Sequence, residues 1–267
     1  SGLSLTVMRL DAELEQHWLA PADTPAFRRG GTVQGDLGTE RGEVYTPGED
    51  PIPEASEESR ASAARIIEIL GGIRSLLEEL EPELGRMDAI AGDGDHGQGM
   101  VLGIEAAHAA AEQAAEAGAG ARTVLVQAGA SWSAEAGGTS GALWGAALTS
   151  VGSGFSDQET VTDQQIVTAL VQAVEAVERL GGAKPGDKTM VDAAVPFRES
   201  LAGASGAAGE AIATAAAKAT AAAESTADIV AHKGRARTHG EKSVGTPDPG
   251  AISFSKIVTL LGQQLSA

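Results

Sequence analysis

Residues 56–80, SEESRASAARIIEILGGIRSLLEEL, decide the fold class of this chain. Their large apolar residues recur at intervals of three and four, the spacing that places side chains on one face of a helix. These residues are Ile66, Ile67, Leu70, Ile73, Leu76, Leu77 and Leu80. Ser56 and Ser59 are candidate N-caps, because a serine hydroxyl accepts a hydrogen bond from a free N–H of the first turn. The stretch predicts a long amphipathic helix.

The helical pattern continues to the end of the chain, and no second strand pattern competes with it. Further helices are expected over residues 100–117, 123–136, 143–150, 163–180, 189–201, 208–224 and 252–265. Glycine-rich breaks separate them at 91–99, 137–141, 181–188 and 233–250. With 35 glycines and only 3% aromatic residues, the core must be built from closely packed Ala, Leu, Val and Ile. We expect an all-α domain whose functional residues lie in the breaks.

The first 55 residues have a different composition. Leu3, Leu5 and Val7 alternate with small polar residues, which predicts a short strand, and residues 11–19 predict a turn or a helical segment. Five of the ten prolines lie between residues 21 and 53, together with several glycines, so a partly disordered linker is expected there. The expected organisation is a short N-terminal piece (1–27), a linker (28–55) and a helical domain (56–267).

The charge balance limits the partners of this chain. It has 37 acidic and 19 basic residues, a net charge of −18, which argues against binding to nucleic acid or to an anionic membrane surface. A bound phosphate group should therefore come with a cation. The absence of cysteine excludes disulfides, thiolate metal sites and cysteine nucleophiles, and is compatible with a reducing cytoplasm.

Neither the first residues nor the longest uncharged run suggests a targeting or membrane segment. Residues 1–5, SGLSL, lack the charged region and the apolar run of a signal peptide. The longest uncharged run, residues 136–156, contains six glycines and six Ser or Thr residues, too polar for a membrane span. We expect a soluble cytoplasmic protein.

Residues 88–97, DAIAGDGDHG, carry three carboxylates, those of Asp88, Asp93 and Asp95. Carboxylate oxygens that converge without a basic neighbour favour a hard divalent cation, and the neighbouring glycines permit tight turns. A solvated acidic turn is the alternative. An EF-hand starting at Asp93 fails, because Gln98 and Ile104 stand where glycine and glutamate are needed.

A dinucleotide fingerprint also fails in this loop. Residues 92–97 match the GxGxxG letters, but no apolar strand precedes them and two aspartates would repel a pyrophosphate. Residues 181–189 approach a phosphate-binding P-loop, but Asp187 stands where its lysine should be.

The other breaks carry weaker signals. Residues 137–141, GGTSG, lead into a helix and offer free N–H groups to an anion, or they only cap the helix. Residues 185–190 open another helix, with Asp187 as an N-cap candidate and Lys188 as a possible surface residue. A basic patch consists of Lys233, Arg235, Arg237 and Lys242. It could bind a phosphate group, and the alternative is a solvated charged loop. His96 is the one histidine inside a candidate site.

In combination these segments resemble the nucleotide-binding domain of dihydroxyacetone kinases, the DhaL or Dak2 type. The matching segments are Asp88 with residues 92–97 (GDGDHG), 137–141 (GGTSG), 186–192 (GDKTMVD), 233–236 (KGRA) and 245–250 (GTPDPG). Residues 2–5 and 20–27 resemble the end of the family's substrate-binding, DhaK-type domain. The chain thus looks like the C-terminal part of a fused kinase.

The resemblance implies a closed barrel of amphipathic helices, preceded by a strand remnant and the linker, with the nucleotide at one end of the barrel. Asp88, Asp93 and Asp95 would hold two Mg²⁺ ions on the phosphates of ATP or ADP. The family's nucleotide contacts carry over to His96, Gly97, Gln98, Gly99, Thr139, Ser140, Gly181, Met190, Arg235, Asp248, Pro249 and Gly250. Gln98 and Gly99 depart from the most familiar members, where a longer side chain often follows the histidine and glycine.

The function that this resemblance implies is donation of the γ-phosphate of ATP to dihydroxyacetone or a related ketose such as erythrulose. In the family the ketose is held covalently by a histidine of the DhaK-like domain, so no catalytic residue is expected in this chain. A homodimer of the full-length protein is expected. Two alternatives are an ADP-carrying DhaL subunit of a phosphotransferase-system-dependent kinase and a non-catalytic regulatory module that binds nucleotide.

Overall fold

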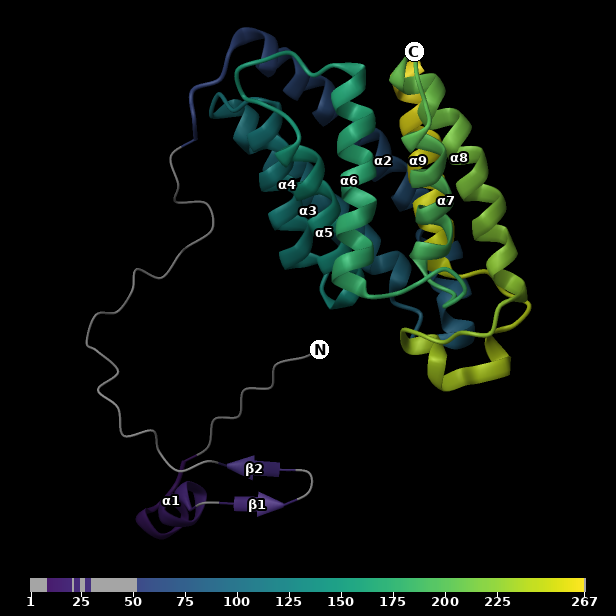
Figure 1. Ribbon diagram of the computed structural model, residues 1–267. Coiled ribbons are helices and arrows are strands. Elements are labelled where there is room, and N and C mark those ends of the chain that lie inside the picture. The colour runs from purple at the N-terminus through teal and green to yellow at the C-terminus, as the bar shows by residue number, and fades with distance from the viewer. Residues whose placement is uncertain (1–8, 21, 25–26, 30–51, 267) are drawn as a thin grey trace. The chain divides into compact units, whose positions relative to one another are not determined.

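The computed structural model describes residues 9–20, 22–24, 27–29 and 52–266 (Figure 1). The chain divides into two units, Ser1–Glu49 and Asp50–Ala267. The strand expected around Leu3 to Val7 lies outside the described residues, and so does most of the expected linker, residues 30–51. The two units are therefore described one at a time.

The first unit contains a short helix and a hairpin. Helix α1 (Ala12–Leu19) begins after Asp11, whose carboxylate accepts a hydrogen bond from the N–H of Leu14 at 2.9 Å. It falls within the segment for which the sequence predicts a turn or a helix. Strands β1 (Ala22–Thr24) and β2 (Phe27–Arg29) pair antiparallel. The sequence pattern does not predict this hairpin, because each strand has only three residues.

The second unit is a closed ring of helices, which confirms the expected all-α barrel (Figure 1). In the described part of this unit, each helix packs against the next along the chain, and the last packs against the first. The helices are α2 (Glu57–Ala91), α3 (His96–Glu116), α4 (Ala121–Glu135), α5 (Gly138–Ser153), α6 (Asp163–Gly181), α7 (Met190–Ala202), α8 (Ala208–Ser225) and α9 (Pro249–Ser266). Two 3₁₀ segments, η1 (Thr226–Asp228) and η2 (Arg235–Ser243), lie between α8 and α9. Among the described residues, none of the helices has the length and apolarity that crossing a bilayer requires.

Helix α2 is longer than its apolar pattern suggests. It continues past Leu80 and through Pro82 to Ala91, although proline removes one backbone donor from a helix. Leu77 and Leu84 are both fully buried two turns apart, so the packed face extends across the proline. Packing thus maintains a helix that local sequence preference alone would end.

The two serines at the start of α2 have different roles. Ser56 is the N-cap, and its hydroxyl accepts a hydrogen bond from the N–H of Ser59 at 3.1 Å. Ser59, the other candidate, is fully buried and is no cap. Its hydroxyl donates to the carbonyl of Ser156 at 2.9 Å and accepts from the N–H of Ala121 at 3.0 Å. It joins α2 to the start of α4.

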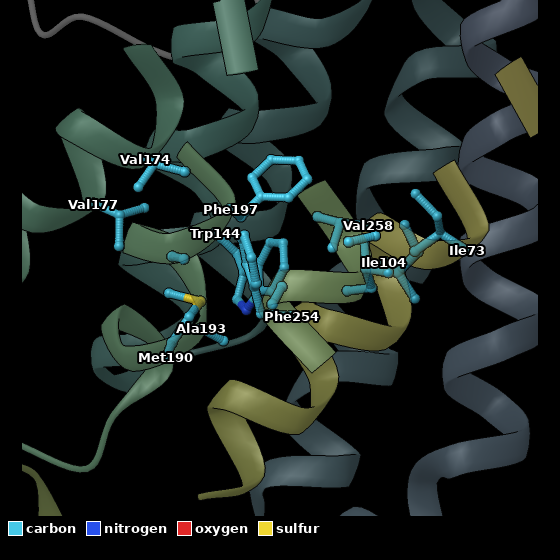
Figure 2. Packing of buried hydrophobic residues seen from close by; sticks show 14 of the residues in the cluster. Ile73, Ile104, Trp144, Val174, Val177, Met190, Ala193, Phe197, Phe254 and Val258 are labelled. Atoms are coloured by element: carbon cyan, nitrogen blue, oxygen red, sulfur yellow. The ribbon is translucent and has the colours of Figure 1, made fainter. Parts of the chain in front are cut away.

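Three aromatic residues, Trp144, Phe197 and Phe254, lie close together in the core of the barrel (Figure 2). Trp144 of α5 stacks on Trp132 of α4, with ring centroids 5.6 Å apart, and lies 6.1 Å from Phe254 of α9. Phe254 in turn meets the edge of Phe197 of α7 at 5.5 Å. These contacts link four helices. Inside the ring lies an apolar cavity of about 350 Å³, lined mainly by side chains of α2, α5, α6, α7 and α9.

The residues directly before α2 pack on the barrel. Ile52 packs against the core, and Ala55 is buried. The N–H of Ser56 donates to the carbonyl of Asp157 at 2.9 Å, and the side chain of Arg60 donates to the carbonyl of Ala55. Residues 52–55, which the sequence analysis assigns to the linker, therefore contact the helical unit.

Close helix crossings explain much of the glycine content. At the crossing of α4 and α5, a Cβ on Gly145 would lie 2.6 Å from the carbonyl oxygen of Gly129 and 2.6 Å from Cβ of Ser133. Backbone atoms cannot move away as a flexible side chain could. These two helices pack at a distance that only glycine permits.

Gly145→Ala is expected to lower the free energy of unfolding. Alanine favours a helix over glycine by about 0.5–1 kcal/mol, but overpacking costs about 1–3 kcal/mol, so a net loss of about 1–2 kcal/mol is expected. Gly203→Ala is the control, because a Cβ there meets nothing within 4 Å and its φ of −98° suits any residue. Urea unfolding measures both variants, and equal midpoints would contradict the close crossing.

Candidate functional site

A cavity of about 400 Å³ opens at one end of the barrel, and its volume is typical of small-molecule sites. It lies where α2 and α6 end and where α3, α5, α7 and α9 begin, at the end away from the C-terminus (Figure 1). Of the residues expected to bind nucleotide or metal, those in its lining are Asp88, Asp95, His96, Gly99, Thr139, Ser140, Gly181, Met190, Arg235, Asp248, Pro249 and Gly250. Asp93, Gly97 and Gln98 are not in the lining.

Three carboxylates converge at the edge of this cavity. Oxygens of Asp88, Asp93 and Asp95 lie within 4.8 Å of one another. The sequence predicts a loop position for Asp88, but Asp88 belongs to the last turn of α2. Its Oδ2 accepts a hydrogen bond from the N–H of Gly94 at 2.8 Å, and a Cβ on Gly92 would lie 2.3 Å from its Oδ1. The two glycines let the loop fold tightly against Asp88.

The electrostatics of the three carboxylates favour a cation. Burial raises the pKa of Asp95, and the negative charge of Asp88 raises this pKa further. The guanidinium of Arg235, from η2, pairs with Asp93 and lies 3.0 Å from Asp95. Because these side chains are more than half exposed, the ion pairs add little stability. The position of Arg235 shows instead that the carboxylates attract positive charge. Carboxylate oxygens are also ligands that suit Mg²⁺.

The segment from His96 to Gly99 forms the first turn of α3 instead of the expected loop. Nε2 of His96 lies 3.0 Å from Oγ of Ser253 on α9, and burial lowers the pKa of this histidine. Gly97 has a packing role, because a Cβ there would lie 2.2 Å from the carbonyl oxygen of Glu81. Gln98 is exposed. The structure thus places His96 and Gly99 at the cavity and Gly97 against α2.

Helix N-termini surround the same cavity. Thr139 and Ser140 lie in the first turn of α5, which begins at Gly138 and not at residue 143. Gly137 and Gly138 have φ of +63° and +60°, a conformation that favours glycine. Unpaired N–H groups of a first turn, together with the helix dipole, favour an anion such as phosphate.

Helix α7 is capped by Thr189 and not by Asp187, the candidate from sequence. The hydroxyl of Thr189 accepts a hydrogen bond from the N–H of Val191 at 3.2 Å, and Asp192 accepts from the N–H of Thr189 at 2.7 Å. Asp187 instead accepts from the N–H of Lys184 at 2.8 Å. This reciprocal cap sets where α7 begins at the cavity wall.

Asp248 precedes α9 and lies inside the site. Its carboxylate accepts a hydrogen bond from the N–H of Ala251 at 2.7 Å, and its own N–H donates to Oγ1 of Thr226 at 2.8 Å. Burial raises the pKa of Asp248 to about 7, although the hydrogen bond from Ala251 opposes the shift, and the charge of Asp192 raises the pKa further. A carboxylate that is reluctant to ionise therefore lines the same cavity as the acidic cluster.

Sequence reasoning missed two parts of the site. One is an apolar wall made of Met87, Ile90, Trp132, Leu143, Trp144 and Ala183. These residues look like ordinary core positions in the sequence, so no signal distinguishes them. The other is Lys188, which lines the cavity and is 4% exposed, whereas the sequence gives it only as a possible surface residue. Of the basic patch, Lys233 and Arg235 line the cavity.

Comparison with known proteins gives one family. The family model of the DAK2 domain matches residues 90–263. The L-erythrulose 1-kinase of Mycolicibacterium smegmatis is 54% identical over 267 residues, which are 100% of this chain and 47% of that protein. The D-erythrulose kinase of the same organism is 46% identical over 262 residues, 96% of this chain and 45% of that protein. The chain spans about half the length of these relatives.

A solved structure shares the fold. It is the crystal structure of the dihydroxyacetone kinase from C. freundii in complex with AMP-PNP and Mg²⁺, with a TM-score of 0.61 and 22% sequence identity. The superposition covers 95% of this chain and 42% of that chain.

The raised pKa of Asp248 predicts that stability depends on pH. An aspartate in an unfolded chain has a pKa of about 3.9, so between about pH 4 and pH 7 the folded protein keeps a proton that the unfolded chain loses. The contribution of Asp248 to the free energy of unfolding should therefore fall as the pH rises through this range. Asp248→Asn keeps an acceptor oxygen for the helix cap and should remove this contribution.

The measurement is urea unfolding from pH 4 to pH 8, with EDTA and without nucleotide. The exposed Asp163, in the first turn of α6, provides the control variant Asp163→Asn, whose profile should follow that of the unsubstituted protein. If the pH profile of Asp248→Asn also runs parallel to that of the unsubstituted protein, Asp248 does not titrate in this range.

Proposed function

The chain belongs to the DAK2 domain family, and from this premise we propose that it binds Mg²⁺ and ATP and donates the γ-phosphate to a ketose held by a separate domain. The substrates proposed are dihydroxyacetone and erythrulose. The activity is that of a kinase, in keeping with relatives that are named erythrulose kinases. The named complex of the C. freundii enzyme with AMP-PNP and Mg²⁺ supports the choice of nucleotide and metal.

One observation carries this proposal: three carboxylates and several helix N-termini meet at a single cavity. Phosphates would be repelled by the carboxylates alone, in a chain whose net charge is −18. Metal ions held by Asp88, Asp93 and Asp95 would remove this conflict, and the helix N-termini would bind phosphate oxygens. Neither group suffices alone to bind a nucleotide at this place.

The metal site is assigned to Asp88, Asp93 and Asp95, with two ions as the expected number. When bound, Mg²⁺ neutralises the charge that develops on the transferred phosphoryl group. The three carboxylates hold and orient the cation, and Gly94 fixes Asp88 through its N–H. Arg235, at the rim of the cluster, is placed to contact phosphate as well as carboxylate.

The nucleotide site is assigned to the remaining residues of the cavity. The first turns of α3 and α5 supply N–H groups, through His96, Thr139 and Ser140, whereas Gly99 lines the cavity with its own N–H donated to the carbonyl of Asp95. The apolar wall around Trp144 offers a surface for the base of the nucleotide, since aromatic faces stack on bases. Gly97 and Gln98 remain proposed contacts through their backbone, because their side-chain positions do not line the cavity.

The acceptor site is assigned to another domain. Phosphoryl transfer depends mainly on positioning and electrostatics, and this chain supplies the donor half of the arrangement. Residues 1–27 are proposed to be the end of a DhaK-like substrate domain, which is consistent with relatives about twice the length of this chain. Relatives named for both L- and D-erythrulose match this chain well, which supports selection of the sugar outside it.

Further features of the proposal concern the whole protein. We propose a cytoplasmic enzyme that forms a homodimer at full length. A fused, ATP-using kinase is favoured over an ADP-carrying subunit, because the match to L-erythrulose 1-kinase extends over the N-terminal 55 residues as well as the barrel. The third alternative is a non-catalytic regulatory module. Turnover by the full-length protein would exclude this alternative, and a lack of turnover would support it.

Mg²⁺ and ATP together should stabilise the chain far more than either alone. At about 100 times Kd, a ligand adds about 2.7 kcal/mol to the free energy of unfolding, which raises the Tm of a domain of this size by roughly 5–10 °C. Thermal unfolding with ATP, with Mg²⁺, with both, and with both plus EDTA measures this. An equal rise in the presence of EDTA would contradict metal bridging.

Asp93→Asn and Asp95→Asn should each abolish the joint rise in Tm and leave the far-UV spectrum unchanged. Both side chains are more than half exposed, so their loss removes metal ligands without disturbing the core. Asp163→Asn, on the exposed face of α6, is the matched control and should keep the rise. Unfolding of either site variant would indicate a structural role instead.

This chain alone should bind nucleotide but should not phosphorylate a ketose. A coupled assay of ADP release, with dihydroxyacetone or erythrulose, tests the chain alone and then with a separately produced substrate domain. Addition of that domain should restore part of the turnover, because losing the covalent link lowers the effective concentration of one domain near the other. Robust sugar-dependent turnover by this chain alone would place the acceptor site here.

A further inference from the structure

Lys188 occupies an unusual position for a lysine. It lies just before α7, its side chain is 4% exposed, and it lines the cavity of the candidate site. Its φ of +61° is the only positive φ of a non-glycine residue in the described part of the chain. This conformation is unfavourable for a residue with a Cβ and persists only where the surroundings hold it. The contacts of the side chain explain what holds it.

The ammonium group of Lys188 is bound by three backbone carbonyls. Nζ donates to the carbonyl oxygen of Ile229 at 3.1 Å, to that of Thr246 at 2.7 Å, and to that of Ser243. A lysine ammonium has three N–H groups, so every donor has an acceptor. Burial lowers the pKa of Lys188, while the negative charges of Asp248 and Asp228 oppose this shift. The carbonyl oxygens thus surround the ammonium group as they would a bound metal cation.

The three carbonyls belong to the two ends of one segment, residues 229–246, here called the Arg235 loop. Ile229 stands at its start, and Ser243 and Thr246 stand near its end. Ser243 also joins the two ends, because its hydroxyl accepts a hydrogen bond from the N–H of Ala231 at 3.0 Å. Between these ends the loop reaches over the cavity, where Arg235 contacts Asp95 at 3.0 Å.

We propose that Lys188 is a positioning residue of the nucleotide site, whose ammonium gathers the two ends of the Arg235 loop and so places Arg235 at the carboxylates. A direct contact of Lys188 with phosphate does not fit the geometry, because its three N–H groups are already engaged by carbonyls. The consequence for Mg²⁺ and ATP binding rests on the proposed function, but the effect on the loop does not. The two parts are therefore tested separately.

The first test measures the loop without any ligand. Lys188→Met keeps the length of the side chain and removes its three donors, and Lys256→Met, at an exposed position of α9, is the matched control. The loop itself contains trypsin sites at Lys233, Arg235, Arg237 and Lys242. Mass spectrometry monitors trypsin cleavage of the full chain at these sites. Cleavage should be at least about tenfold faster in Lys188→Met, because its rate depends on the fraction of molecules in which the loop is open. The control should be cut like the unsubstituted protein.

The second test measures binding by calorimetry with Mg²⁺ and ATP. Lys188→Met should bind at least about tenfold more weakly, and Lys188→Arg, which keeps the charge and several donors, should recover part of both the affinity and the resistance to trypsin. Unchanged cleavage combined with weaker binding would overturn the proposal in favour of a direct phosphate contact. Normal cleavage and normal binding would overturn it outright. If even the unsubstituted chain does not bind Mg²⁺ and ATP, the proposed function is wrong, and the trypsin result still decides the role of Lys188 in the loop.

A third measurement observes the ammonium group directly and needs only the conservative variant Lys188→Arg for assignment. In the unsubstituted chain labelled with ¹⁵N-lysine, the Nζ–H groups of Lys188 should give a signal that exchanges slowly with water, because each is buried and hydrogen-bonded. The resonance is assigned by its loss in Lys188→Arg. A spectrum in which all lysine ammonium groups exchange rapidly would contradict the three carbonyl contacts.

Discussion

Three carboxylates within 4.8 Å of one another are the constraint on which the rest of this site depends. Like charges at such distances repel: burial raises the pKa of Asp95, and the negative charge of Asp88 raises this pKa further. The backbone holds them together: Asp88 lies in the last turn of a 35-residue helix, and a short glycine turn, hydrogen-bonded to Asp88 through Gly94, brings Asp93 and Asp95 back beside it. The repulsion is tolerable only because positive charge is available nearby, from Arg235 and, under the proposed function, from Mg²⁺.

Closure of the barrel is what completes this site. Helix α9 packs against α2, which brings the residues that precede and begin α9 beside the acidic turn. The contact of His96 with Ser253, 157 residues apart in the sequence, spans this closure at 3.0 Å. The Arg235 loop precedes α9, so its position depends on the same packing. A barrel that failed to close would leave the carboxylates without their counter-charge, and in this sense the fold and the site form together.

Sequence reasoning identified the helices because each has an apolar face with the helical period. It misplaced their ends, since packing and caps decide these: α2 runs through Pro82 to include Asp88, and α3 begins at His96. The grouping of distant motifs at one cavity came from the family resemblance, because no local pattern tells which breaks share one end of a ring. Lys188 was missed for a physical reason: its partners are main-chain carbonyls, which every residue has, so its burial has no signature in the sequence.

The site also depends on the apolar interior beneath it. Trp144 and Met190 line both the site cavity and the apolar cavity inside the ring, so a thin layer of side chains separates a charged chamber from an uncharged one. Charges beside such a layer interact through less water, and each favourable or unfavourable pair weighs more than it would at an open surface. The raised pKa of Asp248 reflects the unfavourable side of this arrangement. Under the proposed function, the same surroundings would strengthen the attraction of a cation to carboxylates and phosphates. The packing that raises the pKa of Asp248 would then also favour binding of a metal and a nucleotide together.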